Sequence, residues 1–277
     1  MSGMTEKDGY LLGRTEAELE RLRLQAEIYA PHSEHLLALA GIEPGMRVLD
    51  IGCGAGDLTM AAAALVVPGG SVLGVDMDAD VLELARARVA EAGLTNVTFD
   101  QATVPDVELA EPADALIGRL ILIHVADPVG VVRKCAALVR PGGVLSFQEL
   151  SPAHAGSVPD TPLVAAAYRW VIDTLRAGGG DPATGQQLYR ILRDAGFTEI
   201  GTAMEIPAGD AQSALPRFVA GTVRSLLPRI EAAGVATRAE IGIDTLAERI
   251  VAELRAADAV LWPPELVAVW TRVTGDR

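Results

Sequence analysis

Between Met46 and Glu149 the sequence alternates short apolar runs with stretches of helical periodicity. The apolar runs are short and end in polar residues or glycine, whereas the stretches between them place apolar side chains on one helical face. The expected strands are 48–51, 72–75, 97–99, 113–118 and 144–149, and the expected helices are 57–67, 80–92 and 129–139. Strands that alternate with helices at this spacing form βαβ units, because parallel neighbours need a crossover connection. The pattern therefore predicts an α/β fold with a doubly wound, mostly parallel sheet.

Further elements are expected on both sides of this core. An amphipathic helix at 15–30 has a possible cap at Thr15 and is expected to end before Pro31. The later expected elements are helices at 163–175 and 186–195, a strand at 197–206, a wholly helical segment at 211–257 and a last strand at 267–273.

Composition narrows the class of protein. The chain has 23 Lys and Arg against 37 Asp and Glu, a net charge of −14, so a nucleic-acid partner is not expected. The two cysteines, Cys53 and Cys135, are far apart and predict neither a disulfide framework nor a metal cluster. The longest apolar run, 60–67, is too short to span a bilayer, and the first residues lack a signal-peptide pattern. We therefore expect a cytoplasmic protein with no membrane or metal partner.

The run "VLDIGCGAGD", residues 48–57, contains three glycines where the first strand should end. In open α/β sheets ligands bind at the carboxyl ends of the strands. The dinucleotide fingerprint G-x-G-x-x-G would require glycine at position 57, but Asp57 stands there and would repel a pyrophosphate. No Gly-Lys-Ser/Thr follows, so the loop is not a Walker loop either. An NAD-dependent oxidoreductase is thus the less favoured alternative.

Two carboxylates indicate another ligand. Asp76 closes the second expected strand and is placed to accept hydrogen bonds from ribose hydroxyls. Asp50, just before the glycines, suits a ligand with an ammonium group. These preferences together describe S-adenosylmethionine, an adenosine derivative that carries an ammonium group and no phosphate chain.

Four stretches in order resemble the class I S-adenosylmethionine-dependent methyltransferases: "VLDIGCGAGDLT", "VLGVDMDADVLELARAR", "RLILIHVADP" and "LVRPGGVLSFQE". The resemblance is strongest to the small-molecule branch with the ubiquinone and menaquinone C-methyltransferases, and it covers about residues 31–150. It implies a Rossmann-like, seven-stranded, mostly parallel sheet in the order 3-2-1-4-5-7-6, with helical lid segments added. Residues 1–30 would form an N-terminal helical lid, and 31–277 the cofactor-binding domain with a helical insertion at 211–257.

The resemblance also implies the cofactor site. Asp50 and the glycines would line the methionine portion, Asp76 would bind the ribose, and Met77 would pack on the adenine. The family often has Gly-Asp after the third strand, where this chain has Ala102 and Thr103. The full set of expected cofactor-binding residues is Tyr10, Gln25, Asp50, Gly52, Cys53, Gly54, Gly56, Leu58, Asp76, Met77, Ala102, Thr103 and Arg119.

Three side chains are candidates for the chemistry. His124 follows the fourth expected strand, Glu149 ends the fifth, and His154 lies in the next loop. Each has a plain structural alternative, since a histidine or glutamate at such a place also packs and hydrogen-bonds locally. Positioning alone can lower the barrier to methyl transfer by roughly 7–11 kcal/mol, so a general base is optional.

We therefore expect a methyltransferase that acts at O, N or C of a small, largely apolar or aromatic metabolite. Secondary metabolism is one candidate role for such an enzyme. A protein of this fold with non-methylating chemistry or a ligand-binding role is the main alternative, because fold does not fix chemistry. The sequence leaves the oligomeric state open, a homodimer included.

Overall fold

The computed structural model describes residues 16–275, which form two compact units. The helical unit comprises the residues up to Ile28, Ala155–Gly180 and Pro207–Pro263. The sheet unit comprises Tyr29–His154, Asp181–Ile206 and the residues from Pro264 onward. Within residues 16–275 every helix is too short or too polar to cross a membrane.

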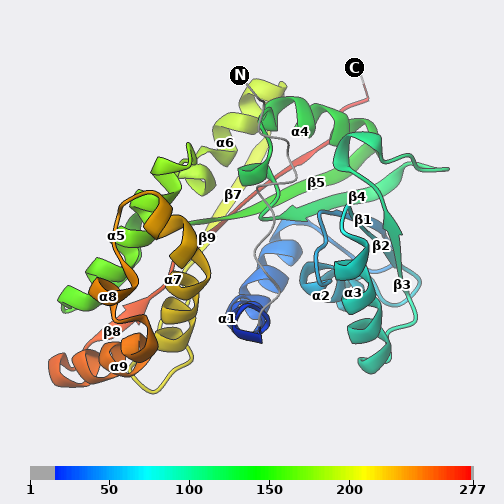
Figure 1. Cartoon of the computed structure of the whole chain (residues 1–277). Coiled ribbons are helices and arrows are strands. Elements are labelled where there is room, and N and C mark those ends of the chain that lie inside the picture. The colour runs from blue at the N-terminus through cyan, green and yellow to red at the C-terminus, as the bar shows by residue number, and fades with distance from the viewer. Residues whose placement is uncertain (1–15, 276–277) are drawn as a thin grey trace. The chain divides into compact units, whose positions relative to one another are not determined.

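The sheet unit contains one seven-stranded sheet, in the order β3-β2-β1-β4-β5-β9-β7 (Figure 1). Its strands are β1 (Arg47–Ile51), β2 (Ser71–Asp76), β3 (Val97–Gln101), β4 (Ala113–Arg119), β5 (Val139–Ser151), β7 (Ile200–Glu205) and β9 (Glu265–Arg272). The first five strands are parallel, and β9 runs antiparallel between β5 and β7. The predicted doubly wound sheet and its order are thus confirmed.

Helices cover both faces of this sheet. On one face lie α2 (Asp57–Leu65), α3 (Ala79–Glu91) and the second half of α1 (Glu16–Ala40), and on the other lie α4 (Pro128–Ala137) and α6 (Thr184–Ala195) (Figure 1). Alternate residues of the central strands pack into two apolar cores, one on each face of the sheet, because successive strand side chains point to opposite faces. Short 3-10 turns follow three strands: η2 (Val104–Asp106), η3 (Leu122–His124) and η4 (Pro152–His154).

The prediction that the first helix ends before Pro31 is wrong, because α1 continues through Pro31 to Ala40. An internal proline costs about 3 kcal/mol. Two leucines beyond it, Leu36 and Leu37, are fully buried, and burying each stabilises the fold by roughly 1.5–3 kcal/mol. The carboxylate of Glu205 in β7 also accepts hydrogen bonds from two α1 side chains, His32 and His35. Tertiary packing thus outweighs the local signal.

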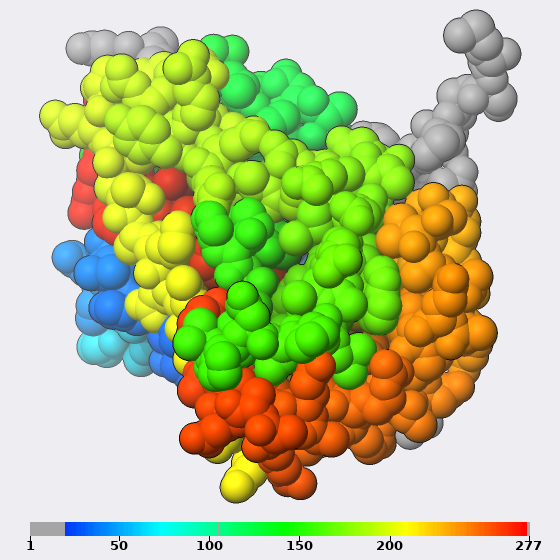
Figure 2. Space-filling view, turned by 90° about the vertical axis from the view of Figure 1, so that its left-hand side faces the viewer, coloured from blue at the N-terminus to red at the C-terminus, as the bar shows by residue number. Residues whose placement is uncertain are grey.

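The segment 211–257 is helical but not continuously so. It forms α7 (Leu215–Ala232), α8 (Arg238–Ile241), η5 (Ile243–Thr245) and α9 (Leu246–Ala257). These helices pack with α5 (Pro162–Ala177) around the apolar core of the helical unit. The Leu163 backbone N–H donates to both carboxylate oxygens of Glu253 at 3.1 and 2.9 Å, and the surfaces of α5 and α9 adjoin (Figure 2). A two-stranded sheet of β6 (Gly156–Val158) and β8 (Val260–Trp262), which the sequence did not predict, completes this unit. The lid role of the segment stays a prediction.

Two buried tyrosines provide a stability test. Tyr168 of α5 is 5% exposed, and its hydroxyl has no hydrogen-bond partner among the described residues, whereas the Tyr29 hydroxyl donates to the Pro264 carbonyl at 2.8 Å. We expect Tyr168→Phe to raise the free energy of unfolding by about 1 kcal/mol, because it removes an unpaired buried hydroxyl. Tyr29→Phe should lower it by about 1 kcal/mol through the lost hydrogen bond. Urea denaturation of both variants checks this, and a destabilised Tyr168→Phe would contradict it.

Candidate functional site

The glycine loop joins β1 to α2 at the carboxyl edge of the sheet. Gly52, Gly54 and Gly56 have φ of 62°, 52° and 84°, a left-handed backbone that other residues adopt with strain. A Cβ on Gly52 would lie 2.6 Å from Cδ1 of Ile121, and one on Gly56 would lie 3.3 Å from Cζ of Phe99. A Cβ on Gly54 would meet no heavy atom within 4 Å. Two of the glycines therefore permit close packing, and Gly54 borders open space.

Asp50, in β1, is a buried carboxyl group in which one of the two oxygen atoms has no hydrogen-bond partner among the described residues. It is 1% exposed, and its Oδ2 accepts a 2.6 Å hydrogen bond from Oγ1 of Thr59 in α2. Its Oδ1 has no partner among the described residues. Burial raises the pKa of Asp50 to about 7, although Thr59 and the charge of Arg119 oppose the shift. A cationic donor placed at Oδ1 would satisfy this atom and favour the ionised carboxylate.

Asp76, the last residue of β2, braces the glycine loop. It is 6% exposed, with Oδ2 accepting from the Gly54 N–H at 2.9 Å and Oδ1 from the Asp78 N–H at 3.0 Å. A carboxylate has about four acceptor positions, so these two bonds leave room for two hydroxyl donors. Met77 follows with half of its surface exposed, and Ala102 donates its backbone N–H to the Asp76 carbonyl at 3.1 Å. The end of β2 thus offers a carboxylate acceptor beside the exposed apolar side chain of Met77.

Asp57 is the first residue of α2 and is held by two arginines. Arg88 contacts it at 2.6 Å, and the Arg119 guanidinium lies 3.5 Å away while donating to the Ser33 hydroxyl at 3.0 Å. Burial lowers the pKa of Arg119, and the nearby Asp57 and Asp50 favour its charged form. A carboxylate at this helix N-terminus occupies the place where a dinucleotide pyrophosphate would bind, which disfavours the NAD alternative.

The remaining residues expected at the cofactor lie in different surroundings. Cys53 and Leu58 are buried, 7% and 3% exposed, and pack in the apolar cores. Burial also raises the pKa of the Cys53 thiol. The Thr103 hydroxyl, at the start of η2, donates to the carboxylate of Asp106 at its end. Gln25 lies in the helical unit and accepts a 2.8 Å hydrogen bond from Arg21, and Tyr10 lies outside the described residues.

Glu149 shapes the turn that follows β4. It is fully buried, and its Oε1 accepts from the backbone N–H groups of Leu122 at 2.7 Å and Ile123 at 3.4 Å. Leu120, between β4 and this turn, has φ of 57°, a left-handed conformation that is rare for leucine. Burial raises the pKa of Glu149 to about 7, and its Oε2 has no partner among the described residues. Glu149 therefore holds a strained turn that ends at the exposed side chain of His124.

The sequence reasoning missed two residues of this region. Thr59, which bonds Asp50, could have been found as the one hydroxyl-bearing residue in the otherwise apolar interior of α2, "LTMAAAAL". Glu265, whose carboxylate contacts His154, was missed because the last strand was expected to begin only at residue 267. No group of three metal-ligating side chains occurs among residues 16–275.

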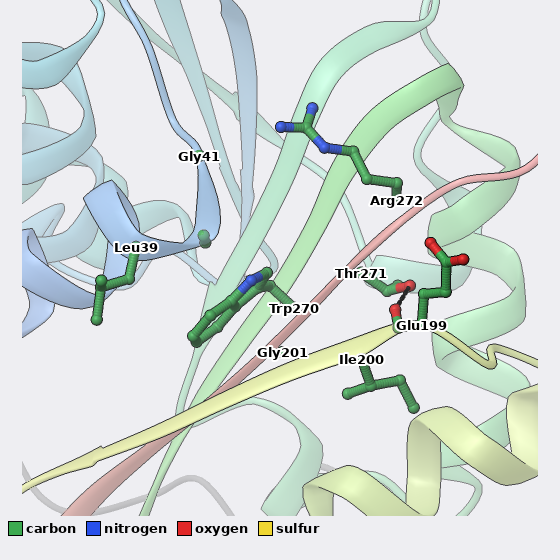
Figure 3. Close-up of a pocket in the computed structure, with 9 residues that line it drawn as sticks. Leu39, Gly41, Glu199, Ile200, Gly201, Trp270, Thr271 and Arg272 are labelled. Carbon is green, nitrogen blue, oxygen red and sulfur yellow. Dashed lines mark hydrogen bonds between the residues drawn. The ribbon is translucent and has the colours of Figure 1, made fainter.

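A separate cavity of about 480 Å³ lies near the amino ends of the parallel strands, at the other edge of the sheet. Its walls come from the end of α1, the start of β7 and the end of β9, and the Trp270 indole extends toward Leu39 and Gly41 (Figure 3). Gly201 permits this packing, since a Cβ there would lie 2.2 Å from the indole. The cavity is therefore remote from the glycine loop.

Comparison with known proteins agrees with this architecture. The sequence model of a family described as "Methyltransferase domain" matches residues 42–196, more than half of the chain. The ubiquinone biosynthesis O-methyltransferase of Vibrio vulnificus (strain YJ016) is 42% identical over 109 residues, 39% of this chain and 45% of that protein. The chain thus matches somewhat less than half the length of such curated relatives.

Two solved structures share the fold. The YcgJ protein from Bacillus subtilis has a TM-score of 0.54 at 18% identity, covering 88% of this chain and 99% of that one. Phosphoethanolamine N-methyltransferase 2 from Haemonchus contortus, solved with S-adenosylhomocysteine, has a TM-score of 0.56 at 18% identity, covering 98% of this chain and 60% of that one. With the family match over residues 42–196, these findings show that the chain belongs to the methyltransferase domain family, with the Rossmann-like fold of class I S-adenosylmethionine-dependent enzymes.

Proposed function

We propose that this chain transfers a methyl group from S-adenosylmethionine to a small, largely apolar or aromatic metabolite. The observation that carries the proposal is the buried Asp50 carboxyl with its unpartnered Oδ1, beside a glycine loop that Asp76 braces. A cofactor with an ammonium group and two ribose hydroxyls matches these two acceptors, and a pyrophosphate does not.

Four groups of the sheet unit would hold the cofactor. Asp50 would accept from the ammonium group, Asp76 would accept from the ribose hydroxyls, and Met77 would offer an apolar surface for the adenine. Gly54 borders the space that the ligand fills, because no side chain projects there. When bound, S-adenosylmethionine supplies an electrophilic methyl group on a sulfonium.

The acceptor atom is proposed to be an oxygen on an aromatic ring. The relatives at about 42% identity are named ubiquinone biosynthesis O-methyltransferases, which supports a phenolic hydroxyl, and the net charge of −14 disfavours a polyanionic substrate. His124, Glu149 and His154 are the candidate side chains for the acceptor, since His124 and His154 follow the carboxyl ends of β4 and β5 and Glu149 lies near the carboxyl end of β5. A cytoplasmic location, a homodimer and a place in secondary metabolism stay predictions.

The proposal is tested by isothermal titration calorimetry with S-adenosylhomocysteine and, separately, with NADH. We expect the wild-type chain to bind S-adenosylhomocysteine and not NADH, and Asp76→Asn to weaken binding at least tenfold through the lost charge-assisted bonds to ribose. Asp100→Asn, on an exposed residue of β3, serves as the control and should leave binding unchanged. Incubation with radiolabelled S-adenosylmethionine and a panel of catechols, amines and active-methylene compounds then identifies the acceptor atom. NADH binding without S-adenosylhomocysteine binding would overturn the proposal.

A further inference from the structure

A buried carboxylate contacts one of the candidate side chains. Glu265, the first residue of β9, is 1% exposed. Its Oε1 accepts from Nδ1 of His154 at 3.0 Å and from Nε2 of Gln186 at 3.0 Å. The three side chains come from β9, η4 and α6, so separate elements of the sheet unit converge on one oxygen atom.

The chemistry of this contact fixes the histidine tautomer. A carboxylate oxygen accepts hydrogen bonds, so the hydrogen of the bond between Nδ1 of His154 and Glu265 is carried by Nδ1. The Gln186 amide nitrogen lies within reach of both partners, and as a donor it also bonds to the carboxylate. In neutral His154 the basic lone pair therefore lies on Nε2. The His154 side chain is 69% exposed, so the ring extends outward from its buried anchor.

The location of His154 is at the ligand-bearing edge of the sheet. It lies in η4, directly after β5, and β5 pairs with β4, the strand beside β1 and its glycine loop. Ser151 at the end of β5 is in register with Glu265, so the carboxylate sits at the same edge. Ligands of open α/β sheets bind at this edge.

We propose that Glu265 is a positioning residue that fixes His154 as the Nδ1–H tautomer and presents Nε2 as a proton acceptor for the hydroxyl that is methylated. This inference rests on the proposed function. The hydroxyl proton passes to Nε2 while the hydroxyl oxygen bonds to the methyl carbon. The electron pair of the broken carbon–sulfur bond stays on sulfur, and the imidazolium then releases its proton to water. Gln186 holds the carboxylate in place from α6.

The experiment combines a tautomer measurement with kinetics on the full chain. Nitrogen-15 NMR of histidine-labelled protein at pH 8, with His154 assigned through His154→Gln, should show the Nδ1–H tautomer in the wild type and its loss in Glu265→Leu. With catechol as acceptor, His154→Gln should lower kcat about 100-fold, within the range for general bases. Glu265→Gln should lower kcat about tenfold, with KM and the Kd of S-adenosylhomocysteine unchanged.

The matched control is Glu205→Gln, which alters the other histidine–glutamate contact, at His32 and His35, and should leave kcat unchanged. An Nε2–H tautomer in the wild type, or a Glu265→Gln variant with unchanged kcat, overturns the inference and leaves the proposed function intact. Loss of S-adenosylhomocysteine binding in Glu265→Gln also overturns it, since Glu265 would then be needed to maintain the folded cofactor site and would not act through His154. A wild type that neither binds S-adenosylhomocysteine nor methylates any acceptor overturns the proposed function, and the tautomer measurement still decides whether Glu265 fixes the ring.

Discussion

S-adenosylhomocysteine is expected to bind about tenfold more weakly at pH 6 than at pH 8, and Asp50→Asn should abolish that pH dependence. Burial raises the pKa of Asp50 to about 7, so the free protein carries a neutral carboxyl group below this value and an ionised one above it. The ligand's ammonium group favours the ionised form. Binding below pH 7 must therefore first remove a proton, which weakens apparent affinity by up to tenfold per pH unit.

Variants of Asp50 and its neighbour show whether Asp50, and not another group that titrates near neutrality, causes the pH dependence. Asp50→Asn should weaken binding roughly 10–100-fold at pH 8, because it loses the free energy of a hydrogen bond to a charged group. It should also give a flat pH profile, although Glu149 still titrates near pH 7. Thr59→Val removes the bond that lowers the pKa of Asp50, so the loss of affinity should begin at a higher pH. Asp114→Asn, at the amino end of β4, is the control. A pH-dependent Asp50→Asn would contradict the assignment, and calorimetry from pH 5.5 to 8.5 makes the measurement.

Features of the fold that depend on neighbouring residues could be predicted from the sequence, and features that depend on contacts between distant residues could not. The strands could be located because each ends in a local signal, such as the glycines after Ile51 or Asp76 at the end of β2, whereas their order in the sheet was expected only from the family resemblance. The helix that passes through Pro31 was not predictable, since its continuation depends on burying Leu36 and Leu37, and Leu37 packs against distant strands. Local propensity lost to tertiary packing there.

The same limit applies to the candidate site. Asp50 and Asp76 could be singled out because a carboxylate at the end of an apolar strand is unusual in itself. The carboxylate of Glu265 is 111 residues away from His154, and nothing local in either segment indicates that they meet. Helix α5 likewise packs with the helices of 211–257 in one unit through apolar contacts between residues far apart in the sequence. The spacing of apolar residues within each segment does not indicate which segments pack together.

Gly54→Ala should weaken S-adenosylhomocysteine binding at least tenfold while costing the fold only about 1 kcal/mol, the strain of alanine at positive φ. Gly54 has φ of 52°, and a Cβ there would meet no protein atom within 4 Å, so the new methyl group would occupy the space in front of the loop. If the cofactor lies in that space, the methyl group and the ligand exclude each other.

Gly93→Ala is the matched control for this effect. Gly93 follows α3, has φ of 67°, and a Cβ there would also meet no heavy atom within 4 Å. Both variants should therefore lose the same free energy of unfolding in urea, and only Gly54→Ala should lose affinity in calorimetry. Equal affinities in the two variants would mean that the ligand does not contact the loop at Gly54. A much larger stability loss in Gly54→Ala would instead mean that its backbone bond to Asp76 is a folding determinant, because that 2.9 Å bond is the main feature that distinguishes the two glycines. Comparison of the two variants thus shows whether the glycine at position 54 is needed for ligand binding or for the stability of the fold.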